Sequence, residues 1–209
     1  DVDGDWLDLE TTAAAPARAE ATDAMEAMPA GEEPAPQAAA GIDPLPQASE
    51  EAVAAIPPEA GPVALREAAA GGDPKALYEI GNRYAEGRGV AVDMARAAEW
   101  YAKAAEDGLA PAQYRLGSFY EKGIGVGRDI AAAKKWYAQA AEAGNASAMH
   151  NLAVLHAMDA QTAGENETAA RWFMRAAELG VRDSQFNLGI LSAKGVGMPQ
   201  NLQEAYKWF

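Results

Sequence analysis

The chain carries the stretch "ALYEIGNRYAEGRGVAVDMARAAEWYAKAAEDG" at residues 76–108, and this stretch decides the fold. Copies of it recur at one fixed distance. Four of the five tryptophans lie 36 residues apart, at Trp100, Trp136, Trp172 and Trp208. The same step links Gly81, Gly117, Ala153 and Gly189. A constant period without insertions predicts one structural unit stacked on copies of itself.

Each unit is predicted to contain two helices, the first over 74–86, 110–122, 146–158 and 182–194. In the first helix, small and apolar residues recur at offsets of 4, 5 and 8, which trace one helix face. Glycine at 81 and 117 would let a neighbouring helix come close, and Tyr84 and Tyr120 would cover the next turn.

The second helix is predicted to begin after a residue with a short side-chain oxygen that satisfies free N–H groups. These N-caps are Asp93, Asp129 and Asn201. The helix is expected to bury the "WY…AA" pattern, with the tryptophans filling the space between units. Glycines at 108, 144 and 180 are expected to end it in the left-handed conformation.

The phase of the repeat also sets the domain boundaries. A stretch at 62–72 aligns with the end of a second helix, which predicts a lone N-terminal cap helix. Full units follow at 73–108, 109–144 and 145–180, and a truncated unit at 181–209. The expected fold class is all-α, a solenoid of antiparallel helix pairs.

Residues 1–61 differ in composition and are expected to form a disordered acidic Ala/Pro linker. The first 63 residues hold 9 of the 12 prolines and fourteen acidic residues against one basic residue, Arg18. Such a segment has too few large apolar side chains to offset the entropy of ordering. Trp6, Leu7 and Leu9 form either a short docking peptide or part of a solvated tail.

Composition excludes several functions. Residues 64–209 carry seventeen acidic and sixteen basic residues, with no basic stripe for nucleic acid. No apolar run approaches the length of about 18 residues that spans a membrane, so no membrane contact is expected here. The absence of cysteine excludes disulfides and thiolate metal sites. Because the chain lacks an initial Met and ends inside a helical pattern, we expect a piece of a longer protein.

With these residues in view, 64–209 resembles the Sel-like repeat family, which is related to the tetratricopeptide repeat. Three segments resemble the sequences of PodJ-type polar localisation factors of bacteria. They are "PAQYRLGSFYEKGIGVGRD" (111–129), "GNASAMHNLAVLHAM" (144–158) and "DSQFNLGILSAKGVGMPQNLQEAYKWF" (183–209). That resemblance implies a scaffold at a cell pole, with these repeats in the periplasm behind a single inner-membrane span. It also implies a peptidoglycan-binding domain outside this stretch.

Glycine-rich loops at 87–93, 123–129 and 195–201 invite comparison with phosphate-binding loops. No strand precedes them and no nucleotide fingerprint is met, so they are predicted to be turns. The third unit has "DAQTAGEN" at 159–166 instead, and its turn is expected to be less regular and a candidate functional loop. His150 and His156 lie six residues apart, whereas a helical metal pair needs three or four. We expect no cofactor, metal or catalytic residues.

The candidate binding site is a groove on the first helices, which line the concave face of superhelical repeats. The residues assigned to it are Tyr78, Asn82, Tyr114, Arg115, Ser118, His150, Asn151, Phe186 and Asn187. A second interpretation is that the aromatic members pack between adjacent first helices, and the sequence leaves both open.

The predicted function is a non-enzymatic scaffold that binds protein partners. Two alternatives stay open: a secreted or periplasmic repeat regulator that inhibits a signalling partner, and a peptidoglycan-associated wall protein or enzyme.

Overall fold

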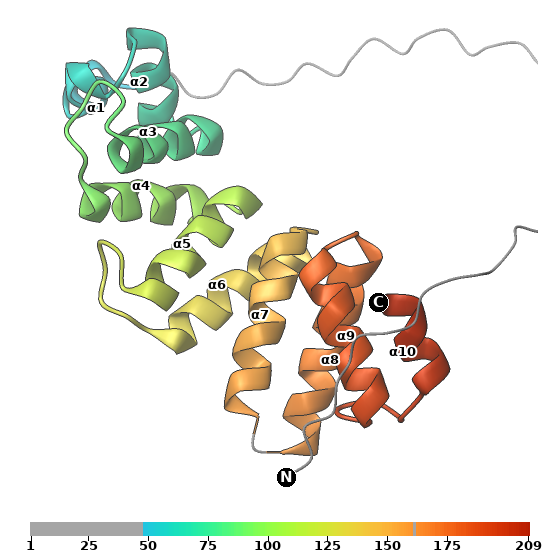
Figure 1. Cartoon of the computed structure of the whole chain (residues 1–209). Helices are drawn as coiled ribbons and strands as arrows, with labels where there is room; N and C mark the ends of the chain where they lie inside the picture. Colours follow the sequence, from blue (N-terminus) through green and yellow to red (C-terminus); the bar gives the residue numbers. More distant parts are fainter. Residues whose placement is uncertain (1–47, 161) are drawn as a thin grey trace, which may run out of the picture. The chain divides into compact units, whose positions relative to one another are not determined.

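The computed structural model describes residues 48–160 and 162–209, where helices joined by turns and loops are the only regular elements (Figure 1). The predicted all-α fold is therefore confirmed for this part of the chain. The Trp6 peptide and the linker up to residue 47 lie outside it. The elements are α1 (Glu50–Ala54), the 3-10 turn η1 (Pro58–Ala60), α2 (Val63–Ala70), α3 (Pro74–Glu86), α4 (Met94–Glu106), α5 (Ala110–Lys122), α6 (Ile130–Glu142), α7 (Ala146–Asp159), α8 (Ala163–Glu178), α9 (Arg182–Lys194) and α10 (Leu202–Trp208).

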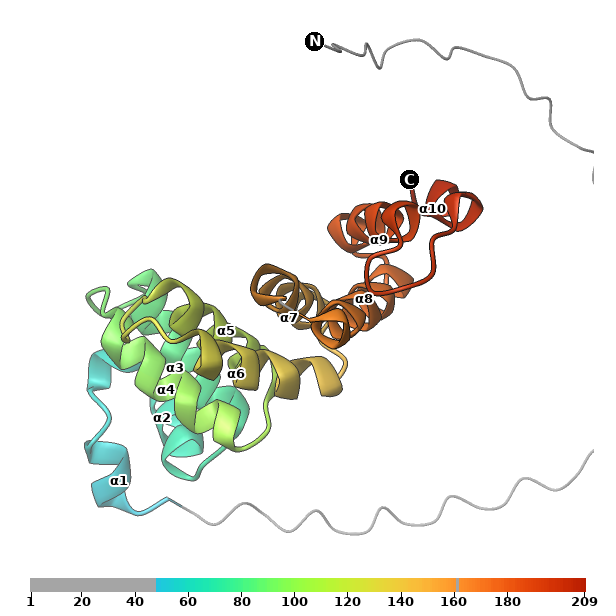
Figure 2. The ribbon, with the colours of Figure 1, turned by 90° about the horizontal axis from the view of Figure 1, so that it is seen from below.

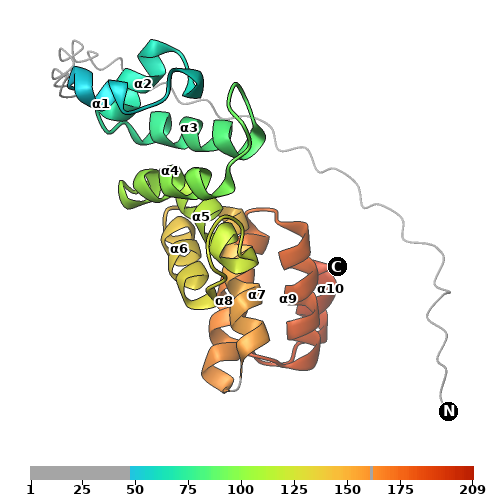
Figure 3. The same cartoon turned by 90° about the vertical axis from the view of Figure 1, so that its left-hand side faces the viewer.

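Helix pairs repeat with the expected period. The first helices are α3, α5, α7 and α9, and each packs on the second helix that follows it, α4, α6, α8 or α10 (Figures 1 and 2). Each second helix then packs on the first helix of the next unit, as Figure 3 shows for α4 and α5. All four first helices begin and end within one residue of the positions predicted from sequence.

A ring packed on a small residue joins the two helices of every unit. A Cβ added to Gly117 of α5 would lie 2.8 Å from the ring of Tyr137 in α6. Gly81 faces Tyr101 in the same way, and Gly189 faces Phe209. In the third unit the small residue is Ala153, which is fully buried. The expected close approach at these glycines is thus confirmed.

The fully buried rings of the core are tyrosines, whereas Trp100, Trp136 and Trp172 pack against the core from its edge. Tyr101 and Tyr137 are 1% and 0% exposed, whereas Trp100, Trp136, Trp172 and Trp208 are only half-buried. Adjacent residues on a helix point about 100° apart, so only one residue of each "WY" pair can face inward. Trp100, Trp136 and Trp172 each have a cation over the ring, and Lys103 Nζ is 4.5 Å from the Trp100 ring centre.

The second helices start at the caps that the sequence indicates. Asp93, Asp129 and Asn201 each accept a hydrogen bond from the backbone N–H three residues on, at 2.9–3.0 Å. The loop before each cap begins with a left-handed glycine, and Gly125 in the second loop also has a positive φ. A Cβ on Gly125 would overlap the carbonyl of Met94, so this loop lies against the start of α4.

The structured region starts before the predicted boundary at Pro62, which is a second correction. Ile56 and Ala60 are 4% and 0% exposed and belong to the core. Pro58 lies 36 residues before Met94, so η1 stands at the position where a second helix would begin. The prolines at 57 and 58 resemble linker composition, and this hides the first turn of the cap from the sequence.

The third unit differs in its turn. The other units have loops at 87–93, 123–129 and 195–201, whereas α7 and α8 are separated only by 160–162. Both helices extend into the space of the missing loop. Thr162 caps α8 through a reciprocal capping box with Glu165, and Asp159 at the end of α7 pairs with Lys134 of α6 at 2.7 Å. The unit therefore keeps the period with a short, capped link.

Candidate functional site

We define the first-helix face as the surface formed by the outward sides of α3, α5, α7 and α9. All nine predicted groove residues lie on these helices. Arg115 and Phe186 are exposed, and the other seven are half-buried. The structure brings them together mainly as pairs that link one helix or one unit to the next.

The aromatic members and His150 pack in tilted or edge-on contacts against a ring of the second helix in their own unit. Ring centres are 5.4 Å apart for Tyr78 and Tyr101, and 5.8 Å apart for Tyr114 and Tyr137. His150 meets Phe173 at 5.8 Å, and Phe186 meets Phe209 at 5.7 Å. Their ring partners thus lie on second helices, and contacts between adjacent first helices add to these, as His150 of α7 meets Ser184 of α9.

Polar groove residues bind the tyrosine hydroxyls. Tyr101 donates to Asn82 Oδ1 at 2.8 Å. Tyr137 donates to Glu121 Oε2 at 2.6 Å and accepts from Asn151 Nδ2 at 3.1 Å. Burial raises the pKa of Tyr101 to about 12, and burial followed by the hydrogen bond to Glu121 raises the pKa of Tyr137 as well. Both hydroxyls therefore stay protonated at neutral pH and serve as fixed donors.

Two further pairs join neighbouring units. Arg115 of the second unit bonds the Tyr78 side chain of the first, and this bond is the main reason that the pKa of Arg115 is raised. His150 Nδ1 lies 2.8 Å from the hydroxyl of Ser184 in the fourth unit. Burial lowers the pKa of His150 and, with less effect, Asp183 opposes it. The imidazole is therefore neutral at pH 7 and acts in packing.

The first-helix face changes character along the chain. Residues 82, 118, 154 and 190 are equivalent in the repeat and read Asn, Ser, Val and Ile. The last two contribute to an apolar groove of about 290 Å³ between α7 and α9, with Phe173 of α8 also in its lining. The remaining walls come from Ala157, Met158, Asn187 and Leu191. Met158 is 74% exposed, so the groove is open to solvent.

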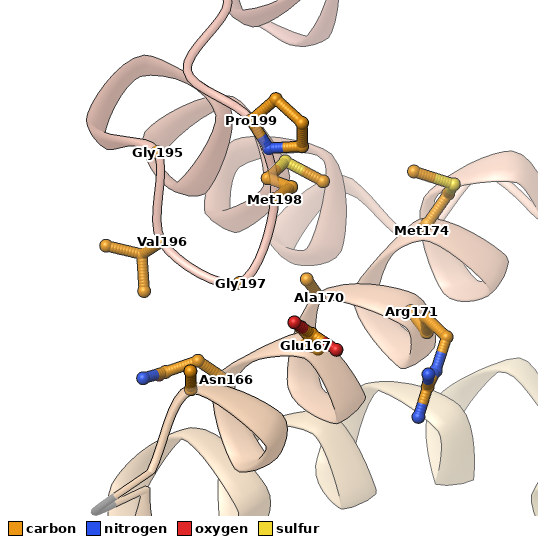
Figure 4. A pocket seen from close by; sticks show the side chains of 11 residues that line it. Asn166, Glu167, Ala170, Arg171, Met174, Gly195, Val196, Gly197, Met198 and Pro199 are labelled. Atoms are coloured by element: carbon orange, nitrogen blue, oxygen red, sulfur yellow. The ribbon is translucent and has the colours of Figure 1, made fainter.

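A larger pocket of about 750 Å³ lies between α8 and the loop 195–201 (Figure 4). Met198 of the loop and Met174 of α8 project into it from its two sides (Figure 4). Glu167 and Arg171 are its charged residues. None of the predicted groove residues lines it. The repeat could have pointed to this pocket, because Met174 stands at the position where the preceding units have alanine, at 102 and 138.

Within 48–160 and 162–209, no three His, Asp or Glu side chains gather in a way that could hold a metal ion. In the same ranges, no helix has the length and apolarity needed to cross a bilayer. The glycine loops serve as turns against neighbouring helices, as Gly125 does at Met94.

The Sel1 repeat model matches the chain four times, at 74–109, 110–145, 146–181 and 182–209. A search of curated protein sequences gives no significant match. Proteins built from these repeats generally act as protein-interaction scaffolds, and their fold is typically non-catalytic.

Two solved structures share the fold. One is c5321, a protective antigen present in uropathogenic Escherichia coli strains that displays an SLR fold, with 31% identity and a TM-score of 0.65. The match covers 69% of this chain and 31% of that one. The other is a Sel1 repeat protein from Oxalobacter formigenes, with 34% identity and a TM-score of 0.62 over 67% of this chain and 58% of that one. With four matched repeats and these neighbours, the chain belongs to the Sel1 repeat family.

Proposed function

We propose that this chain binds a protein partner on its first-helix face and acts there as a non-catalytic scaffold. The observation that carries the proposal is a contrast within the repeat. The contact of a ring on a small residue recurs in all four units, while equivalent positions on the face differ, as at Asn82, Ser118 and Val154. A surface that varies on a constant frame is suited to recognition.

The exposed chemistry of this face suits a protein partner. Arg115 offers a charged guanidinium at the surface, and the neighbouring helices expose Met158 and Phe186. Arginine and aromatic residues are enriched among the residues that dominate binding energy at protein interfaces, and methionine is enriched at interfaces generally.

We further propose a location, in the periplasm at a cell pole, as part of a polar localisation factor. The support is the resemblance of residues 111–129, 144–158 and 183–209 to PodJ-type proteins. In such proteins the repeats belong to a membrane-anchored scaffold that marks a cell pole.

Affinity capture with the intact chain tests the binding surface. Asn151 and Tyr114 contact Tyr137, so their substitution would disturb packing as well as the face. Arg115→Ala with Asn187→Ala changes the face at two sites with less effect on the core. The matched control is Lys103→Ala on α4. We expect the double variant to lose most captured partner and the control to retain it; equal capture by both would refute this surface.

Cysteine labelling tests the compartment. The chain has no cysteine, so Ser147→Cys at an exposed position of α7 provides one label site in this region. A membrane-impermeant maleimide should label the full-length protein once the outer membrane is permeabilised and the inner membrane is intact. Labelling only after the inner membrane is opened would contradict a periplasmic location. The unsubstituted protein supplies the background.

A further inference from the structure

We propose that the groove between α7 and α9 is a specific subsite for one bulky apolar side chain of an extended peptide, whose main chain bonds the Asn187 amide. This inference rests on the proposed function, since it names what one part of the first-helix face recognises. The groove consists of Val154, Met158, Phe173, Asn187, Ile190 and Leu191, with Ala157 beside them.

The repeat shows why Asn187 is available. Asn187 is equivalent to Asn151, whose amide donates to the Tyr137 hydroxyl of the preceding unit at 3.1 Å. The residue equivalent to Tyr137 is Phe173, which has no hydroxyl. Within the part of the chain that the structure describes, the half-buried Asn187 amide forms no hydrogen bond, although it lines the groove beside Phe173. The amide is therefore free to bond a ligand at the edge of the groove.

The same replacement makes the groove apolar. In the first unit, Asn82 accepts from the Tyr101 hydroxyl, so the equivalent position is polar and occupied. Here Val154 stands in place of Asn82, and Phe173 in place of Tyr101. No charged residue lines the groove, and Asn187 is the one polar side chain in its lining. The matching ligand is therefore an uncharged apolar side chain next to a hydrogen-bonding group.

The size of the groove favours a single anchor on an extended chain. Its walls are Val154–Met158 and Asn187–Leu191, each about 6 Å long at the 1.5 Å rise of a helix. An amphipathic helix inserting residues i, i+4 and i+7 would need about 10 Å. The volume of about 290 Å³ falls just below the range of about 300–1,000 Å³ for small-molecule pockets. Main-chain amides next to the anchor can reach Asn187.

A methyl NMR titration of the full chain tests the subsite. The probe is the capped pentapeptide Gly-Ser-Leu-Ser-Gly, and the matched probe carries Ala in place of Leu. We expect saturable shifts confined to the methyl groups of Val154, Met158, Ile190 and Leu191. Replacing Leu by Ala should weaken binding by about tenfold, because most of the buried apolar area is lost.

Three variants separate the contributions of the groove. Ile190→Ser removes a wall and should weaken binding of the Leu peptide by about tenfold. Phe173→Tyr should weaken it too, because the new hydroxyl would bond Asn187 as Tyr137 bonds Asn151. Asn187→Ala should weaken it by removing the main-chain contact. Val92→Ser, at an exposed valine in the loop 87–93, is the matched control and should bind like the parent.

The outcomes distinguish this subsite from the scaffold function. Shifts spread over the surface, or binding that Ile190→Ser and Phe173→Tyr both leave unchanged in folded protein, would overturn the subsite. Partner capture that depends on Arg115, without peptide binding, would overturn the subsite and leave the scaffold standing. Peptide binding that the variants abolish, without any captured partner, would support the subsite and count against the scaffold.

Discussion

The second unit (109–144) and the third unit (145–180) have one architecture and different chemistry. In the second, Gly117 lies against Tyr137, whose hydroxyl bonds Glu121 and Asn151. In the third, Ala153 and Phe173 occupy the equivalent positions, without a hydroxyl. The second has a glycine loop over 123–129, and the third a short link at 160–162.

This difference shows which features the fold requires. A ring on a small residue and a fixed period are sufficient to continue the stack. The hydroxyl network and the glycine loop are options that one unit uses and the next does without. The positions released from the network, Val154 and Asn187, are those that line the apolar groove. Changes in packing chemistry thus form the apolar groove that we propose as a peptide subsite.

The largest expected effect separates the two aromatics of the "WY" pair in the second unit. Tyr137→Ala should reduce the free energy of unfolding by about 3–5 kcal/mol, because a fully buried ring is deleted. Trp136→Ala should cost about half as much, since that ring is half-buried. Urea unfolding followed by circular dichroism measures both. A larger loss of unfolding free energy in Trp136→Ala than in Tyr137→Ala would show that the tryptophan is the main core residue of this pair.

The contact between the loop 123–129 and α4 can be tested by comparing two glycines of that loop. Gly125→Ala should cost about 2–4 kcal/mol, because a positive φ and an overlap with the Met94 carbonyl are both unfavourable. Gly127→Ala is the control: its added Cβ meets nothing within 4 Å, and we expect a change within about 0.5 kcal/mol. Thermal melts of the two variants give the comparison. Equal melting temperatures would mean that the loop does not press against α4.

Exchanging the hydroxyl between the units gives a smaller effect. Tyr137→Phe leaves Glu121 and Asn151 without that partner and should cost about 1–2 kcal/mol. Phe173→Tyr should be nearly neutral, because Asn187 can bond the new hydroxyl. Denaturant midpoints measure both. If Phe173→Tyr destabilises as much as Tyr137→Phe, the proposed equivalence of Asn187 and Asn151 fails.

The last effect is a dependence on alkaline pH, which is absent at neutral pH. Burial raises the pKa of Tyr101 from its ordinary value of 10.0 to about 12. Folding therefore disfavours the phenolate: the contribution is complete below pH 10 and declines as the pH rises to about 12. Tyr101→Phe should flatten stability across that window, whereas Phe173 in the third unit has no proton to lose. An unchanged alkaline slope in Tyr101→Phe would contradict this burial effect.

Periodicity was sufficient to predict the helices, their caps and the close contacts at Gly81, Gly117 and Gly189, since these depend on local chemistry repeated at one spacing. It did not show which member of each "WY" pair faces inward, because both are large and apolar. It also missed the cap turn at Pro58, where a composition typical of linkers conceals a helical position.

The predicted binding site was harder to obtain from sequence. The nine predicted residues do lie on the first helices, but Asn82, Asn151 and His150 are bonded to other side chains. These hydrogen-bond partners lie 14 to 34 residues away in the sequence, on another helix. The difference between Asn151, which bonds a tyrosine hydroxyl, and Asn187, which faces Phe173, becomes visible only when those partners are known.

Site-specific photo-crosslinking of the full-length protein in its own cells tests the central claim most directly. A photoreactive residue replaces Arg115 or Asn187 on the first-helix face, or Lys103 on α4 as the control. The account predicts crosslinks to the same protein partner from positions 115 and 187, and none from 103. Crosslinks to that partner from 103 alone would contradict the assignment of the first-helix face as the binding surface.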